Sequence, residues 1–287
     1  MSEPALSADR VGIEFGGLRA LADFDLRIES GNLFGLIGPN GAGKTTAFNL
    51  LTGVYRPTSG EIRVGGARVN DLRPHQITRM GLARTFQNIR LFKELTVIDN
   101  VKVACLAQTR HPLLTGSARW VAAANNYYDW WRALLLTSGY RQEEEEITRD
   151  AESLLSVMGL LELKDETAKN LPYGKQRRLE IARALGTRPK VLLLDEPAAG
   201  MNTREKIELM ALIRELRDRF SLGVLVIEHD MKLVMGICEK ITVLDHGETI
   251  AVGTPEEVRA NPKVIEAYLG GDASLPARAL DRAGAGA

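Results

Sequence analysis

The chain has 287 residues, 45% of them hydrophobic, and a formal net charge of zero from 37 basic and 37 acidic side chains. This balance argues against a protein whose main partner is a nucleic-acid backbone, which is normally met by a net basic face. The two cysteines, Cys105 and Cys238, form no metal-binding or redox motif, which suggests a reducing compartment. There is no signal-peptide pattern and no apolar run near the roughly 20 residues that span a bilayer, so we expect a soluble, cytoplasmic protein.

The first part of the chain is expected to mix short antiparallel strands with one buried strand. Alternating apolar and polar residues predict strands at residues 11–15, 26–29 and 61–64. The continuous apolar run at residues 33–37 predicts the buried strand. A loop follows it, and after the loop a helix is predicted at residues 46–51.

The pattern becomes mostly helical over residues 76–186. Thr96 is expected to cap a helix that includes residues 99–104, and residues 151–158 have apolar side chains at helical spacing. We interpret the helices of about residues 88–186 as a subdomain inserted into an α/β core.

The α/β pattern returns at residue 190. Residues 191–195 and 223–227 are unbroken apolar runs, typical of parallel strands that are covered on both faces. The other elements predicted here are a helix at 204–219, a hairpin with strands at 241–244 and 249–252, and helices at 255–260 and 262–269. Residues 271–287, rich in Ala, Gly and Arg, are expected to be a disordered tail.

One stretch fits the phosphate-binding loop pattern G-x-x-x-x-G-K-[ST]. It consists of Gly38, Pro39, Asn40, Gly41, Ala42, Gly43, Lys44, Thr45 and Thr46. Glycines let the backbone N–H groups turn toward phosphate oxygens, and the N-terminus of the next helix reinforces them. We expect Lys44 to reach the β- and γ-phosphates and the Thr45 hydroxyl to ligate Mg²⁺. A turn that merely joins a strand to a helix needs no Lys-Thr after its last glycine, so we predict a nucleoside triphosphate as ligand.

Three polar residues follow the predicted buried strands. Asp195 is expected to meet the metal, and Glu196 to act as general base or to orient the attacking water. A plain polar turn is the alternative, and the upstream phosphate loop makes it unfavourable. His229 ends the other strand, where parallel sheets bind ligands. It is expected either to donate a hydrogen bond to the γ-phosphate or to be structural. A zinc site is not supported, because no second histidine or cysteine lies at the spacing of zinc ligands.

Two further residues and one helix are weaker candidates. Gln87 begins the helical region, where it would touch Mg²⁺ and the attacking water, although a glutamine is more often a plain surface residue. Phe15 ends a strand, where its ring would stack on adenine, although a phenylalanine is usually a core residue. Residues 171–185 form a turn and a basic helix whose N-terminus would bind an anion, and a capped surface helix is the simpler interpretation.

The order of these motifs resembles the ATP-binding subunits of ABC transporters over nearly the whole chain. Residues 38–45 resemble the Walker A motif, Gln87 the Q-loop, residues 171–176 the signature motif, residues 191–196 Walker B, residues 198–202 the D-loop, and His229 the switch histidine. Phe15 matches the aromatic residue that stacks on adenine. Residues 84–92 and 176–183 are most similar to the ATPases of branched-chain amino-acid importers, and urea and amide importers use similar cassettes.

The resemblance implies an α/β fold with a P-loop NTPase (RecA-like) core, an antiparallel β subdomain and an inserted helical subdomain. Residues 1–270 would form this single ABC ATPase domain. ATP and Mg²⁺ would be the cofactors, with Thr45, Gln87 and Asp195 at the metal. Glu196, His229 and Gln87 would take part in hydrolysis. The signature residues Tyr173, Gly174 and Lys175 would contact the ATP of a second cassette.

The implied function is ATP hydrolysis that drives uptake of branched-chain amino acids across the inner membrane. The partners would be a second ABC ATPase subunit in a homo- or heterodimer, transmembrane permease subunits and, indirectly, a periplasmic solute-binding protein. The chain would sit on the cytoplasmic face of that membrane through the permease. The alternatives are a urea, amide or other small-solute transporter, an exporter or lipid-extraction ATPase, a soluble ABC protein acting on ribosomes or DNA, and a regulator that barely hydrolyses ATP.

Two positions depart from the family pattern. The usual signature is Leu-Ser-Gly-Gly-Gln, and here Pro172 and Tyr173 replace the serine and the first glycine. The serine hydroxyl that binds the partner's γ-phosphate is therefore missing, while the N–H of Gly174 and the helix N-terminus remain. Asn202 stands where many D-loops have aspartate.

All three tryptophans lie within residues 120–131, in part on one helical stripe. Packing inside the helical subdomain is the simpler interpretation, and a surface for the membrane partner is the alternative.

Overall fold

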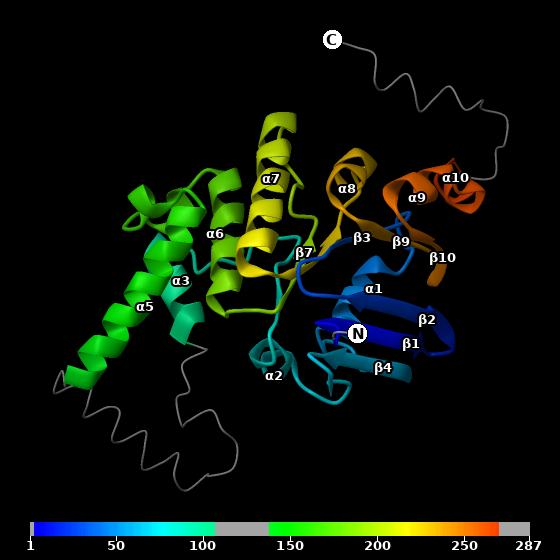
Figure 1. The fold of residues 1–287 in the computed structure, drawn as a ribbon, viewed down its shortest axis with the longest axis horizontal. Coiled ribbons are helices and arrows are strands. Elements are labelled where there is room, and N and C mark those ends of the chain that lie inside the picture. Colours follow the sequence, from blue (N-terminus) through cyan, green and yellow to red (C-terminus); the bar gives the residue numbers. More distant parts are fainter. Residues whose placement is uncertain (1–2, 107–137, 270–287) are drawn as a thin grey trace, which may run out of the picture.

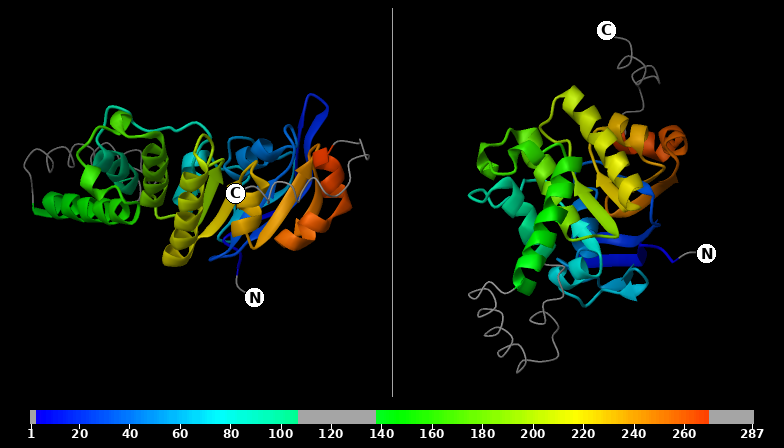
Figure 2. Two further views of the ribbon diagram at one scale, coloured as in Figure 1. Left: turned by 90° about the horizontal axis from the view of Figure 1, so that it is seen from above. Right: turned by 60° about the vertical axis from the view of Figure 1, so that its left-hand side comes forward.

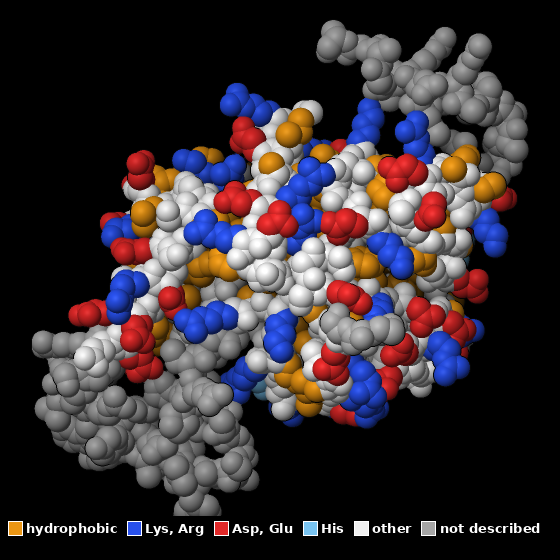
Figure 3. All heavy atoms as spheres, viewed as in Figure 1, with side chains coloured by type: hydrophobic (Ala, Val, Ile, Leu, Met, Phe, Trp, Pro, Cys, Tyr) orange, Lys and Arg blue, Asp and Glu red, His pale blue; other side chains and the backbone are white. Residues whose placement is uncertain are grey.

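The computed structural model describes residues 3–106 and 138–269 (Figure 1). The tryptophan stripe at residues 120–131 and the tail at residues 271–287 lie outside the described residues. Within the described ranges, no helix is both long and apolar enough to cross a membrane. Figure 3 shows basic and acidic side chains interspersed over the face it presents, in keeping with the balanced net charge.

The smaller of two sheets is antiparallel, with the strand order β2-β1-β4-β5. Its strands are β1 (Leu6–Phe15), β2 (Leu18–Ile28), β4 (Ser59–Val64) and β5 (Ala67–Arg68). β1 and β2 begin well before the residues predicted from alternation. The register between them shifts after Ala8, and Arg10 and Asp23 have positive φ angles of 45° and 43°. Such bulges change which side chains face inward, so the alternating pattern is interrupted within each strand.

The larger sheet has six strands in the order β10-β9-β3-β8-β7-β6. They are β3 (Leu33–Ile37), β6 (Leu82–Arg84), β7 (Val191–Asp195), β8 (Gly223–Ile227), β9 (Lys240–Asp245) and β10 (Glu248–Gly253). All neighbours pair in parallel except β10 with β9, which form the predicted hairpin. Every residue of β3, β7 and β8 is buried, which explains their continuous apolar sequences.

β6 is a short strand within residues 76–186 that the sequence pattern did not predict. After the short helix α2 (Pro74–Arg79), three residues form an edge strand that pairs with β7. A strand of three residues is too short to show an alternating pattern, so the surrounding helical signal masked it. Its position matters, because it leads directly into the segment that contains Gln87.

The helices divide into two groups. Around the sheets lie α1 (Lys44–Leu51), α7 (Thr203–Phe220), α8 (Met231–Ile237), α9 (Pro255–Ala260) and α10 (Pro262–Leu269). To one side, α3 (Val97–Leu106), α5 (Ser138–Val157) and α6 (Tyr173–Gly186) pack on one another, with 3-10 turns at Leu161–Leu163 and Ala168–Asn170 between α5 and α6 (Figure 2). Together with the two sheets, this arrangement confirms the predicted fold class.

α1 joins the two sheets into one hydrophobic core. Phe48 and Leu51 of this helix are fully buried in a cluster that also contains Phe24 of β2 and Leu36 of β3. The helix that follows the phosphate-binding loop is therefore fixed by apolar contacts along its length.

Candidate active site

Four neighbouring strands end at the same edge of the larger sheet. The four strands are adjacent in the order β3-β8-β7-β6, and all three pairings between them are parallel. Because the carboxyl ends of parallel strands meet at one edge, the segments that follow these strands come together in space. The phosphate loop, Gln87, Glu196 and His229 lie on these segments, and Asp195 is the last residue of β7.

The phosphate loop has the backbone of an anion cradle. Gly38, Gly41 and Gly43 have φ angles of 153°, 81° and 101°, values that residues with a Cβ rarely adopt. A Cβ on Gly38 would lie 2.1 Å from the carbonyl oxygen of Leu244, so only glycine fits there. The loop can thus turn its N–H groups inward, as phosphate binding requires.

Lys44 is held inside this loop. Its Nζ donates hydrogen bonds to the carbonyl oxygens of Gly38 and Pro39, at 2.7 and 2.8 Å, and its side chain is buried. Burial lowers the pKa of Lys44, and the negative charges of Glu196 and Asp195 partly oppose this effect. An ammonium group that is poorly solvated gains more from contact with a triphosphate than one in bulk water.

A cavity of about 620 Å³ opens over the loop. Its lining consists of residues 40–46 together with Gln87, Glu196 and His229, and of residues 18–20, 246 and 247. The structure therefore gathers one part of the predicted site around a single space, although these residues are up to 189 positions apart in the sequence (229 − 40).

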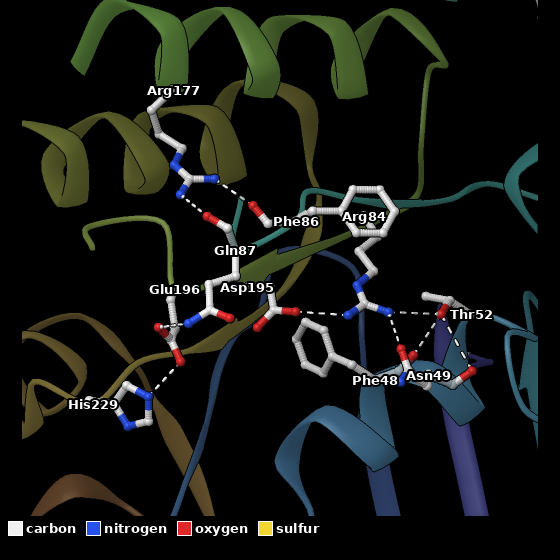
Figure 4. Close-up of polar contacts among 10 residues, drawn as sticks. All are labelled: Phe48, Asn49, Thr52, Arg84, Phe86, Gln87, Arg177, Asp195, Glu196 and His229. Atoms are coloured by element: carbon white, nitrogen blue, oxygen red, sulfur yellow. Dashed lines mark hydrogen bonds and ion pairs between the residues drawn. The ribbon is translucent and has the colours of Figure 1, made fainter. Parts of the chain in front are cut away.

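Glu196 lies at the centre of the polar contacts in this cavity (Figure 4). The Nε2 of Gln87 donates to its Oε2 at 2.8 Å, and the Nε2 of His229 lies 2.5 Å from its Oε1. Glu196 also has a positive φ of 46°, and its N–H donates to the carbonyl of Ile227 on the neighbouring strand. A non-glycine residue in this backbone region is strained, and such strain concentrates at active sites. The contact of His229 with Glu196 favours the functional interpretation over the structural one.

The oxygen groups near the loop suit Mg²⁺. Asp195 is buried at the end of β7, and Thr45 is the second residue of α1. Together with the Gln87 amide they offer carboxylate, hydroxyl and amide oxygens, which hard cations prefer. Across residues 3–106 and 138–269, no group of three or more His, Cys, Asp or Glu side chains could hold a metal by itself. This donor set fits a magnesium ion that is bound mainly through nucleotide phosphates.

The signature residues are not part of this cavity. Tyr173, Gly174 and Lys175 form the first turn of α6, after Pro172, whose side chain gives no cap. Tyr173 is 45% exposed, and its ring lies against Gly200 of the D-loop segment. A single chain therefore does not bring the signature helix to its own phosphate loop.

Phe15 also lies outside the residues that line the cavity. The residue is 46% exposed, which excludes the core interpretation. Its ring makes an edge-to-face contact with that of Tyr55, with centroids 5.3 Å apart and an interplanar angle of 74°. Tyr55 was not expected from the sequence. Its position shortly after the helix α1 offered no motif to identify it.

Sequence reasoning also missed two arginines. Arg177 is fully buried and donates from Nη1 to the carbonyl of Phe86 and from Nη2 to that of Gln87 (Figure 4). Arg84 forms an ion pair with Asp195. Both residues stand in the stretches that resemble the family, but a basic residue in such a stretch gives no sign of its partner.

Asn202, noted above as a departure, has a clear local role. Its side chain accepts a hydrogen bond from the N–H of Glu205 at 3.0 Å and so caps α7, and the Glu205 carboxylate in turn accepts one from the Asn202 N–H.

Comparison with known proteins agrees with this geometry. A family model described as "ABC transporter" matches residues 21–199, and one described as "Branched-chain amino acid ATP-binding cassette transporter" matches residues 248–274. The high-affinity branched-chain amino acid transport ATP-binding proteins LivG of Salmonella typhimurium and BraF of Pseudomonas aeruginosa are each 47% identical over 270 residues, covering 94% of this chain and 99% of theirs. A solved ATP-binding cassette of an ABC transporter in its ADP conformation is 27% identical, with a TM-score of 0.76, covering 94% of this chain and all of that one.

Proposed function

Since the chain belongs to the ABC transporter family and is one of its ATPases, we propose that it is the ATP-binding subunit of an importer for branched-chain amino acids. The observation that supports the substrate assignment is the 47% identity, over nearly the full length, to two proteins named for this transport. The match of residues 248–274 to a model named for the same class supports it independently of the nucleotide motifs.

ATP hydrolysis is accelerated by positive groups and N–H donors that are placed where negative charge develops in the transition state. Lys44 and the loop N–H groups would bind the phosphates. Thr45, Gln87 and Asp195 would hold Mg²⁺, which would supply positive charge beside the phosphate oxygens. Glu196 polarises the attacking water. Gln87 and His229 both hold the Glu196 carboxylate. These contacts orient the carboxylate, and His229 lines the same cavity as the loop that would bind the γ-phosphate.

A second cassette completes each site. Because the signature helix begins outside the chain's own cavity, Tyr173, Gly174 and Lys175 are free to contact ATP bound to a partner cassette. The N–H of Gly174 and the N-terminus of the 14-residue helix α6 supply the positive end of a dipole in place of the missing serine hydroxyl.

The permease subunits dock in a groove beside the Q-loop. The groove has a volume of about 530 Å³, and its lining includes Phe86, Arg90, Leu91, Phe92, Val103 and Arg183. Arg90 lies over the Phe86 ring at 4.0 Å, and Phe86 immediately precedes Gln87. A partner seated here is therefore one residue from the glutamine that contacts Glu196. Docking holds the chain at the cytoplasmic face of the inner membrane, where a periplasmic solute-binding protein acts on it through the permease.

The test is transport in proteoliposomes that contain the chain with its permease subunits and solute-binding protein. We expect ATP-dependent leucine uptake that unlabelled isoleucine and valine compete for and urea does not. Glu196→Gln should abolish uptake and turnover while ATP binding persists. Competition by urea or an amide, with none by valine, would refute the substrate assignment and leave the ATPase assignment intact.

A further inference from the structure

We infer that Arg84 is a positioning residue for Asp195, and that it fixes this carboxylate relative to the helix that follows the phosphate loop. The inference rests on the proposed role of Asp195 at Mg²⁺. It concerns a side chain that contacts neither the loop nor Glu196, and whose function the motifs do not indicate.

The guanidinium of Arg84 joins two parts of the site (Figure 4). Its Nη2 donates to Oδ2 of Asp195 at 2.8 Å, at the end of β7. Its Nη1 donates to Oδ1 of Asn49 at 2.8 Å and lies 3.3 Å from Oγ1 of Thr52. Asn49 belongs to α1 and Thr52 is its C-cap, and the same helix begins with Lys44 and Thr45. One planar group thus sets the distance between the Walker B carboxylate and the Walker A helix.

The surroundings make this link rigid. The side chains of Arg84 and Asp195 are only 9% and 8% exposed. The guanidinium also lies near two aromatic rings, 5.4 Å from the centroid of Phe48 and 5.1 Å from that of Phe86. A charge pair shielded from water in this way has few alternative arrangements.

Only arginine can make all of these contacts. Its fork presents several N–H donors in one plane, so it can bond a carboxylate on one side and an amide oxygen on the other. Lysine carries the same charge as a single point and cannot span both partners at these distances. Arg84 engages Oδ2 of Asp195, and the other oxygen of the carboxylate keeps its lone pairs for the metal ion or its waters. Groups that orient metal ligands in this manner typically change metal affinity or activity about 10–100-fold when they are removed.

The test measures ATP binding to the purified full-length chain by isothermal titration calorimetry, in EDTA and at increasing Mg²⁺. All variants carry Glu196→Gln, which prevents turnover during the measurement. For Arg84→Met we expect binding in EDTA equal to that of the parent, because the phosphate loop is intact. The Mg²⁺ concentration that gives half of the metal-dependent gain in affinity should rise about 10-fold or more. Arg84→Lys should lie much closer to Arg84→Met than to the parent.

The matched control is Arg90→Met. Arg90 lies over the same Phe86 ring, at 4.0 Å, but does not contact Asp195, so its loss should leave the Mg²⁺ requirement unchanged. Thermal unfolding monitored by circular dichroism verifies that each variant is folded. If Arg84→Met does not fold, Arg84→Lys decides: a normal Mg²⁺ requirement in that variant overturns the inference.

Two results would contradict the inference in different ways. An unchanged Mg²⁺ requirement in folded Arg84→Met would overturn the positioning role. A lower requirement would mean that Arg84 competes with the metal for Asp195, which also overturns it. If the parent itself binds ATP without any gain from Mg²⁺, the proposed metal site fails instead of the role of Arg84.

Discussion

The guanidinium of Arg177 on α6 donates a hydrogen bond of 2.7 Å to the backbone carbonyl of Gln87, on the segment that follows β6. The same group bonds the carbonyl of Phe86 at 2.6 Å and the carboxylate of Glu180 at 2.7 Å, and it is fully buried. The signature helix and the Q-loop are therefore joined by a buried charge. One cannot move far from the other without breaking the bonds of this buried guanidinium to the Phe86 and Gln87 carbonyls, which is costly in a protein interior.

Arg177→Met should lower the free energy of unfolding by about 3–5 kcal/mol, because it leaves the Glu180 carboxylate buried and unpaired. Urea denaturation of the chain without nucleotide measures this change. Arg178→Met is the matched control: the neighbouring pair with Glu208 is partly exposed, at 3.4 Å, and its loss should cost less than about 1 kcal/mol. The double variant Arg177→Met/Glu180→Leu should regain part of the loss. No recovery would show that the unpaired carboxylate is not the cause.

His229→Ala should reduce ATP turnover about 10²-fold or more, because it removes one of the two groups that hold the Glu196 carboxylate. Binding of ATP should persist, since the phosphate loop is unchanged. Steady-state hydrolysis and nucleotide binding separate these effects. His75→Ala, on the exposed face of α2, controls for the loss of an imidazole. Unaltered turnover in His229→Ala would assign this histidine a structural role.

Gly38→Ala should destabilise the chain and abolish binding of ATP, because the added Cβ would lie 2.1 Å from the Leu244 carbonyl and the φ of 153° suits glycine alone. Thermal unfolding with and without ATP measures both effects. Gly236→Ala in α8 is the control, since a Cβ there meets nothing within 4 Å. It should keep or raise stability, by up to about 1 kcal/mol. A Gly38→Ala chain that ATP still stabilises would contradict the cradle geometry.

Glu228→Gln should change how stability depends on pH. Burial raises the pKa of Glu228, although its carboxylate accepts bonds from the N–H groups of Ala198 and His229. Because the folded pKa exceeds the unfolded value, the stability that this group contributes is full below the unfolded pKa and is lost as the pH rises through the folded one. Glutamine cannot ionise, so the unfolding free energy of the variant minus that of the wild type should increase with pH.

Urea denaturation of both proteins between about pH 4.5 and pH 8 measures this difference. Parallel pH profiles would mean that the environment of Glu228 does not disfavour its charged form.

Much of the fold followed from local patterns. The bounds of β3, β7, β8, α9 and α10 are those expected from apolar runs and from helix starts at proline. The exceptions have definite causes. The bulges near Arg10 and Asp23 shift the inward-facing side chains of β1 and β2, and β6 is too short to carry a period of its own.

In the candidate site, too, some residues could be predicted from local sequence and others could not. The loop from Gly38 to Thr46, and the pair Asp195 and Glu196, could be proposed from sequence because each motif is a short run whose backbone conformation and chemistry are local. Gln87 and His229 were candidates only by position, and their common contact with Glu196 emerged in the structure.

The sequence by itself determined the phosphate loop, the buried strands and the family, because turn geometry and apolar periodicity are written in neighbouring residues. Tertiary structure alone decided that Arg84 meets Asp195, 111 positions away, and that Arg177 meets Gln87, 90 positions away. These pairs depend on the order β3-β8-β7-β6 in the sheet and on the packing of α6 beside it. Strand order is set by the burial of whole faces against each other, and no short stretch of sequence contains that information.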